Sequence, residues 1–136
     1  MKLEELLREM VDAKASDIFI IAGLPLSYEV SGRQIRLDSA PLMPDDTETF
    51  VRAIYEVSGR SMQRFVDNGN HDDDFSFAIA GVGRFRANVF RQRGSFGAVI
   101  RVIPFGLPNP ADFHIPEEVL RLARLQKGLV LVTGPA

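Results

Sequence analysis

The stretch RFRANVFRQRGSFGAVIRVIP, Arg84 to Pro104, decides the fold of this 136-residue chain. Two runs rich in Val, Phe, Ile and Arg flank Gly94-Ser95, where a glycine lets the chain turn, so the stretch predicts a β-hairpin. Side chains alternate between the two faces of a strand. One face of the first arm therefore carries Arg84, Arg86 and Asn88, and the other carries Phe85, Ala87 and Val89.

The arginines of this hairpin are its second feature. Between Arg84 and Arg101 there are five arginines and no acid, in a chain whose net charge is −2. A turn near Gly94-Ser95 brings Arg86 and Arg101 close together on one face, and like charges that face each other across a strand pair are destabilising. Guanidinium suits phosphate because its planar fork donates two hydrogen bonds and stays charged. Spacing alone leaves two interpretations open: an anion-binding pair, or arginines on a solvated sheet face.

The composition is typical of a soluble globular protein, with 46% hydrophobic and 25% charged residues. No apolar run approaches the roughly 20 residues of a membrane-spanning helix, so no membrane insertion is predicted. The absence of cysteine excludes disulfides and thiolate metal sites and favours a cytoplasmic protein. Nucleic-acid binding is disfavoured by the net charge of −2 and by the lack of a basic stripe outside the hairpin.

The rest of the first hundred residues predicts short helices and strands. Periodicity and turn residues predict helices at 3–13, 45–56 and 61–66, strands at 17–22 and 72–80, and a second hairpin at 27–37 that turns at Ser31-Gly32. Pro41 and Pro44 are expected to break the chain, and Asp45 or Asp46 to cap the following helix. Sequential hairpins, with a helix before and between them, predict an α+β layer: an antiparallel sheet with helices packed on one side.

A different pattern begins at Pro104. Three prolines within 104–110 predict a linker at 104–115, and Pro116 starts a predicted helix that runs to about Leu125. An apolar strand at 129–133 then leads into Gly134-Pro135, as at the start of a parallel α/β nucleotide-binding domain. We therefore expect a first domain at 1–103, a linker at 104–115 and the start of a second domain at 116–136.

Two short motifs are candidate ligand sites. Thr133-Gly134-Pro135-Ala136 could open a phosphate-binding loop, G-x-x-x-x-G-K-[ST], yet only the first glycine is present and an ordinary strand end is the simpler interpretation. His71-Asp72-Asp73-Asp74 gathers possible ligands for a hard cation. Because successive residues of a strand point to opposite sides and the calcium-loop pattern is missing, we predict no metal site here. We interpret the motif as a solvated strand start whose acids balance the charge of the arginine hairpin.

Several segments recur, in the same order, in a known family. They are Ala15–Ile20 with Ala22–Pro25, Gly32-Arg33, Asp74–Phe77, Gly81–Asn88 and Gly128–Pro135. Together they span almost the whole chain, which resembles the N-terminal part of type IV pilus retraction ATPases. One residue departs from the pattern: Phe19 stands where many retraction motors have His, as in the accessory retraction ATPases.

The resemblance implies a PAS-like N-terminal domain, a linker and a RecA-like ATPase domain, in motors that form homo-hexamers and act with the inner-membrane platform of the pilus. In that family, arginines of the N-terminal hairpin reach the phosphates of ATP, which the RecA-like domain binds with Mg²⁺. The matching positions are Arg86 and Arg101, then Arg91 and Arg93, with Gly134, Pro135 and Ala136 at the start of the phosphate-binding loop. The resemblance also places the catalytic residues outside these 136 residues, so the chain alone is expected to hold no cofactor tightly.

Two functions of different classes follow. The first is the nucleotide-contacting, ring-forming part of an ATPase that powers pilus retraction. The second is a stand-alone PAS-like sensor or adaptor that binds a small ligand or a partner without catalysis. The codons that follow Ala136 discriminate between them: a continuation with G-x-G-K-[ST] supports the ATPase, and a stop codon supports the sensor.

Overall fold

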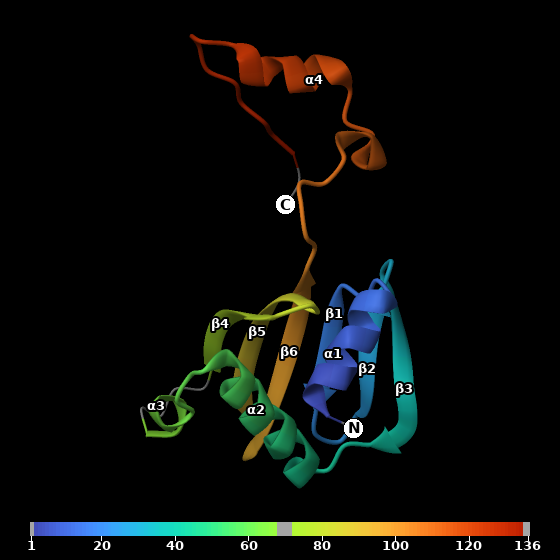
Figure 1. Cartoon of the computed structure of the whole chain (residues 1–136), viewed down its shortest axis with the longest axis vertical. Helices are drawn as coiled ribbons and strands as arrows, with labels where there is room; N and C mark the ends of the chain where they lie inside the picture. The colour runs from blue at the N-terminus through green and yellow to red at the C-terminus, as the bar shows by residue number, and fades with distance from the viewer. Residues whose placement is uncertain (1, 68–71, 135–136) are drawn as a thin grey trace. The chain divides into compact units, whose positions relative to one another are not determined.

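The computed structural model describes residues 2–67 and 72–134. The chain divides into two compact units, Met1–Phe105 and Gly106–Ala136. The first unit contains all of the sheet and both longer helices (Figure 1). The second contains only short helical turns within its described residues.

The first unit is built on one antiparallel sheet of six strands. Its elements are α1 (Leu3–Asp12), β1 (Asp17–Ile21), β2 (Pro25–Val30), β3 (Arg33–Pro41), α2 (Pro44–Ser58), α3 (Gln63–Asp67), β4 (Asp72–Ile79), β5 (Gly83–Gln92) and β6 (Ser95–Ile103). The strand order is β3-β2-β1-β6-β5-β4, so β1 lies between β2 and β6 at the centre. The prediction of an α+β layer with an antiparallel sheet is confirmed.

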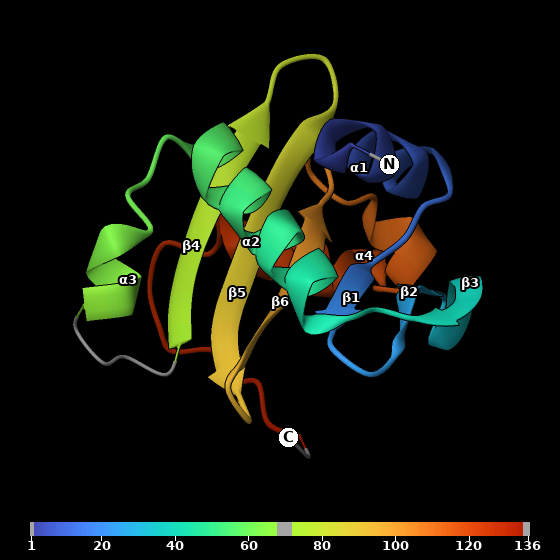
Figure 2. The ribbon, with the colours of Figure 1, turned by 90° about the horizontal axis from the view of Figure 1, so that it is seen from below.

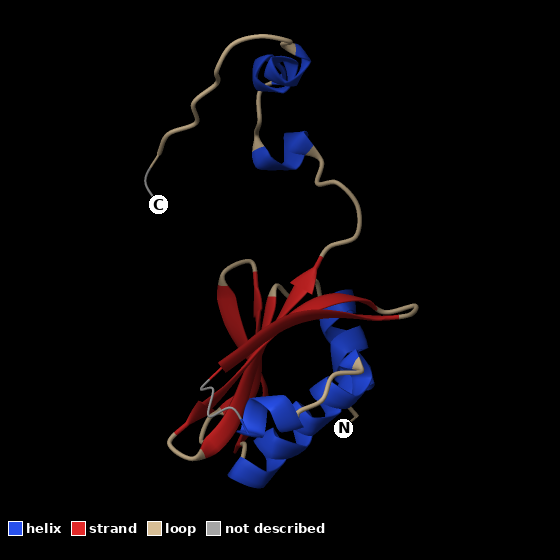
Figure 3. Ribbon diagram, turned by 90° about the vertical axis from the view of Figure 1, so that its left-hand side faces the viewer, coloured by secondary structure: helices blue, strands red, loops and turns tan. Residues whose placement is uncertain are grey.

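Both longer helices cover the same face of the sheet and leave the other face open (Figure 3). Helix α2 crosses the sheet, where it packs on β6, β4 and β1 (Figure 2). The core between these layers is apolar, because the inward-pointing positions of β1 and β6 are aliphatic or aromatic. Its fully buried members include Leu6, Leu7, Met10, Ile18, Ile20, Val51, Ile54, Phe85, Val89 and Ile100.

Two prolines behave differently from the prediction that they break the chain. Pro41 is the last residue of β3 and pairs with Pro25 beyond an irregularity in the β2–β3 ladder. An edge strand tolerates proline because its outer N–H groups need no partner strand. Pro44 is the first residue of α2, a position where the missing N–H costs nothing.

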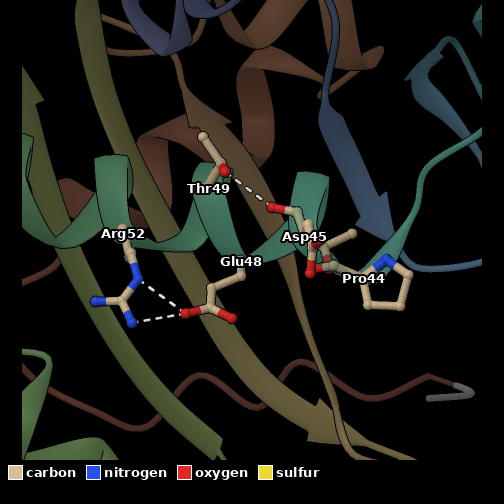
Figure 4. Close-up of polar contacts among 6 residues, drawn as sticks. Pro44, Asp45, Glu48, Thr49 and Arg52 are labelled. Carbon is tan, nitrogen blue, oxygen red and sulfur yellow. Dashed lines mark hydrogen bonds and ion pairs between the residues drawn. The ribbon is translucent and has the colours of Figure 1, made fainter.

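The predicted cap of α2 is also corrected. Met43 is the N-cap residue, and the Asp46 carboxylate accepts a hydrogen bond from the Met43 backbone N–H (2.8 Å). Asp46 therefore serves the helix start from its third position, where a carboxylate also favours the positive end of the helix dipole. Farther along, Arg52 donates to Glu48 through Nε (2.9 Å) and Nη2 (2.6 Å) on the outer face of α2 (Figure 4).

The turn of the arginine hairpin lies one residue earlier than predicted. Gln92 pairs with Ser95, so Arg93 and Gly94 form the turn instead of Gly94 and Ser95. Both turn residues have positive φ, 50° and 82°, as a two-residue hairpin turn that matches the strand twist requires. The other hairpin turns at Ser31-Gly32 as predicted.

The second unit does not form the predicted strand. Its elements are two short 3₁₀ helices, Pro110–Phe113 and Leu122–Arg124, and α4 (Glu117–Arg121). The predicted helix from Pro116 to Leu125 is therefore split, and residues 129–133 have no regular structure. A strand needs a neighbour to receive its backbone hydrogen bonds, and none of the described strands pairs with this segment. Leu129, Leu131 and Val132 are exposed as a result.

Candidate functional site

A row of polar side chains crosses the open face of the sheet, opposite the helices. In strand order from β4 to β3 its members are Ser76, Arg86, Arg101, Asp17, Glu29 and Gln34, each of which is the register partner of the next. The residues that alternate with them, such as Phe85 and Ile100, are buried beneath the helices. The row therefore lies wholly on the open face.

Arg86 and Arg101 are direct partners at the centre of this row. Arg86 lies on β5 and Arg101 on β6, and each sits at the register position opposite the other. The prediction that these two arginines share one face and lie close together is confirmed. Because the turn lies at Arg93-Gly94, one residue earlier than predicted, Arg86 and Arg101 are direct register partners.

Each arginine of the pair is bound by one carboxylate. Arg86 donates from Nε to Oδ1 of Asp74 (2.9 Å) and from Nη2 to Oδ2 (2.7 Å). Arg101 donates from Nε to Oδ1 of Asp17 (2.9 Å). Asp74 reaches Arg86 diagonally, since its own register partner is Asn88. The four side chains therefore follow one another as acid, arginine, arginine, acid, with the two arginines in the middle.

The two carboxylates reduce the repulsion that the sequence predicts between Arg86 and Arg101. Hydrogen bonding to Arg86 holds the pKa of Asp74 below its ordinary value, and the same bond raises the pKa of Arg86. The contact therefore favours the charged forms of Asp74 and Arg86, and the flanking acids offset the repulsion between the arginines. The fold can therefore hold the two arginines side by side without a bound anion. The two guanidinium groups nevertheless keep N–H donors that no described residue binds.

Those donors are the terminal nitrogens. A guanidinium has five N–H groups. Asp74 accepts two from Arg86, and Asp17 accepts one from Arg101. Within the described part of the chain, both Nη groups of Arg101 and Nη1 of Arg86 have no further partner. This arrangement can bind an oxyanion between the two strands.

The other predicted arginines lie elsewhere. Arg91 faces the opposite side of β5 from Arg86, and its guanidinium lies over the ring of Phe96 (4.7 Å to the centroid). Arg93 occupies the hairpin turn. Arg84 does share the open face with Arg86, at the position opposite Ile103. Sequence reasoning noted its face but did not include it among the site residues.

The predicted charge balance between the acidic motif and the hairpin is confirmed for Asp74, which binds Arg86. The sequence did not predict which acid of the motif makes the contact, and it predicted no role for Asp17. The hairpin is local in sequence, but Asp17 and Arg101 are separated by 84 positions. Only the placement of β1 beside β6 brings them together, and a sequence signal for that pairing was lacking.

The acidic motif is divided by strand alternation. Asp73 points to the helix side, where it accepts a hydrogen bond from the Tyr55 hydroxyl (2.8 Å) and lies 3.6 Å from Arg60. Asp74 points to the open side, and His71 lies outside the described residues. Across residues 2–67 and 72–134, no three potential ligands gather into a metal site.

The start of the predicted phosphate-binding loop lies only partly within the described residues. Gly134 is exposed and follows a segment without regular structure. Pro135 and Ala136 lie outside the described residues.

The helices of the described residues include no candidate for a membrane-spanning segment, because each is too short or too polar.

Comparison with known proteins shows what this chain is similar to. No family model matches the sequence. The chain is 37% identical over 135 residues to the type IV pilus ATPase PilU of Pseudomonas aeruginosa, covering 98% of this chain and 34% of that protein. It is 35% identical over 136 residues to PilT of the same organism, covering 99% of this chain and 38% of PilT. This chain is a homologue of the PilT/PilU type IV pilus ATPases.

A solved structure agrees with the sequence match. The crystal structure of the pilus retraction motor PilT with bound ADP superposes with a TM-score of 0.75 at 40% identity, covering 99% of this chain and 38% of that chain. The α+β unit of this chain matches the N-terminal region of PilT in structure. The chain spans about a third of the length of the relatives it matches.

Proposed function

We propose that this chain is the N-terminal, nucleotide-contacting and ring-forming part of a hexameric P-loop ATPase that powers type IV pilus retraction. Support comes from the match to PilT and PilU and from the ADP in the PilT crystal structure. In this proposal residues 1–103 are a PAS-like domain, 104–115 a linker, and 116–136 the first helix and strand of a RecA-like domain. The motor is cytoplasmic and acts on the inner-membrane platform of the pilus.

The observation that carries the proposal is the direct pairing of Arg86 and Arg101 with unused terminal N–H groups. Two guanidinium groups side by side suit the phosphates of ATP, which spread negative charge over several oxygens. Phosphoryl transfer depends almost entirely on positioning and electrostatic stabilisation, so an arginine from this face can raise the rate without taking part in bond making.

The remaining predicted positions take smaller parts in the proposal. Arg93, in the turn, and Arg91, over Phe96, extend the positive charge at the end of the hairpin. Gly134, Pro135 and Ala136 begin the loop that cradles phosphate. The arginine pair fits phosphate oxygens, whereas its neighbours Asp17 and Asp74 already bind arginine and offer Mg²⁺ no cluster.

The test is ATP turnover by the full-length protein that contains this chain. Arg86→Ala and Arg101→Ala should each lower turnover roughly 10- to 150-fold, the range expected for a charged hydrogen bond to phosphate. Lysine at either position should rescue only partly, because a point charge cannot replace the planar fork. Arg36→Ala is the matched control, an exposed arginine on the edge strand β3 of the same sheet. Wild-type turnover in both alanine variants would reject the proposal.

A further inference from the structure

We infer that Asp17 and Asp74 are positioning residues for the arginine pair: each binds the Nε side of one guanidinium and leaves the terminal N–H groups for an oxyanion of the phosphate class. The inference rests on the proposed function and adds residues to the same site. It assigns a positioning role to Asp17, for which the sequence predicted none, and to Asp74, whose motif was predicted only to balance the charge of the hairpin.

The division of donors is the first argument. Among the residues that the structure describes, the Asp17 carboxylate accepts only from Nε of Arg101, and the Asp74 carboxylate accepts from Nε and Nη2 of Arg86. An arginine bound along its Nε side keeps an N–H on each terminal nitrogen, and these two point away from the carboxylate as a parallel fork. Both guanidinium groups therefore remain able to form a two-bond contact while their carboxylates stay in place.

Burial supplies the second argument. The Asp17 side chain is 14% exposed and the Arg101 side chain is 66% exposed. The acid is thus the fixed part of the pair, on the central strand β1, and the arginine is the part that solvent or a ligand can reach. A long side chain that is already held in one geometry loses less conformational entropy when it binds a ligand.

Charge points to a geometric role as well. The two acids cancel the charge of the two arginines, so they do not add to the attraction for an anion. If the acids acted chiefly as competitors for the arginines, their removal would strengthen anion binding. If they act by positioning, their removal weakens it. The two roles therefore predict opposite signs.

The experiment measures kcat/KM for ATP hydrolysis by the full-length protein. Asp17→Ala and Asp74→Ala should each lower kcat/KM roughly 3- to 10-fold, the value of a net hydrogen bond that fixes a functional group. Asp17→Asn should remain within about twofold of wild type, because the amide oxygen still accepts from Nε. Asp74→Asn should lose less than Asp74→Ala, because the amide keeps one of the two acceptor oxygens that Arg86 uses. Glu29→Ala is the control: Glu29 is the neighbour of Asp17 in the same row, and its side chain binds no arginine in the described chain.

A double-mutant cycle separates positioning from general destabilisation. In an Arg101→Ala background, Asp17→Ala should have no further effect, since the group it positions is gone. An equal loss in both backgrounds would overturn the inference, as would higher kcat/KM in either alanine variant or asparagine variants as impaired as alanine. The asparagine variants keep the side-chain shape, so these outcomes are readable even if an alanine variant folds poorly.

Failure of this inference is distinguishable from failure of the proposed function. If Arg86→Ala and Arg101→Ala lower turnover but both Asp→Ala variants match wild type, only the positioning role is wrong. If the arginine variants themselves match wild type, the nucleotide-contacting role is wrong.

Discussion

Removal of one hydroxyl group from the Tyr55 side chain should destabilise the first unit measurably. Tyr55 lies on α2 with 2% of its surface exposed, and its hydroxyl donates to Oδ2 of Asp73 on β4 (2.8 Å). Its ring packs against those of Phe65 and Phe75, with centroids 6.2 and 5.2 Å away. Tyr55→Phe keeps the ring and its packing, so the variant isolates the hydrogen bond that joins the helix layer to the edge strand carrying Asp74.

The size of the expected destabilisation depends on the acceptor of the Tyr55 hydrogen bond, the Asp73 carboxylate. A hydrogen bond to a charged acceptor contributes about 1.5–3 kcal/mol. The Asp73 side chain is 25% exposed and keeps Arg60 at 3.6 Å, so the carboxylate is not left without compensation. We therefore expect the free energy of unfolding to fall by about 1–2 kcal/mol. For a unit of this size, the midpoint of thermal unfolding should fall by about 5–10 °C.

The pH dependence gives the same prediction an independent test. Burial, followed by the hydrogen bond to Asp73 and its negative charge, raises the pKa of Tyr55 above the ordinary value for tyrosine. The unfolded chain ionises this phenol near pH 10, whereas the folded chain keeps the proton. The contribution of Tyr55 to the free energy of unfolding is therefore fully present below about pH 10 and declines as the pH rises further. The difference between wild type and Tyr55→Phe should narrow above that pH.

Urea denaturation of the two proteins at pH 7 and above pH 10 provides the measurement. Tyr28→Phe is the control, because Tyr28 is half-buried and its hydroxyl has no hydrogen-bond partner among the described residues. That variant should stay within about 0.5 kcal/mol of wild type at pH 7. A Tyr55→Phe variant as stable as wild type at pH 7, or a difference that stays constant above pH 10, would refute the reasoning.

Three further predictions concern the core, the turn and the tail. Phe85→Ala should lower the free energy of unfolding by about 3–5 kcal/mol, because Phe85 is fully buried and stacks on Phe77. A loss below about 1 kcal/mol in urea denaturation would contradict this packing. Gly94→Ala should cost about 1–2 kcal/mol, because φ is 82° there, whereas Arg93→Gly should not destabilise; the same assay compares them. The exposed apolar segment 129–132 has no partner strand among the described residues, so we expect the chain to self-associate through it. Truncation after Phe105 should then give a monomer of unchanged core stability. An unchanged oligomer in light scattering would show that the tail is not the self-associating part.

Local sequence patterns determined most of the first unit. Alternation of apolar and polar residues predicted β4 and β5, and helical periodicity predicted α1 and α2, because each pattern records which side of an element must leave water. Hairpin connections are short, so the pairing of β5 with β6 and the shared face of Arg86 and Arg101 also followed from the chain itself. The turn was misplaced by one residue because glycine fits either position and only the strand pairing distinguishes them.

Tertiary structure decided what lies beside the arginines. The contact of Asp17 with Arg101 depends on β1 entering the sheet next to β6, a pairing between segments 84 positions apart that no local pattern encodes. The diagonal reach of Asp74 to Arg86 depends likewise on the register of β4. The tail shows the converse. Residues 129–133 have the composition of a buried strand but form none, because backbone hydrogen bonds in a sheet come from neighbouring strands and composition alone cannot provide them.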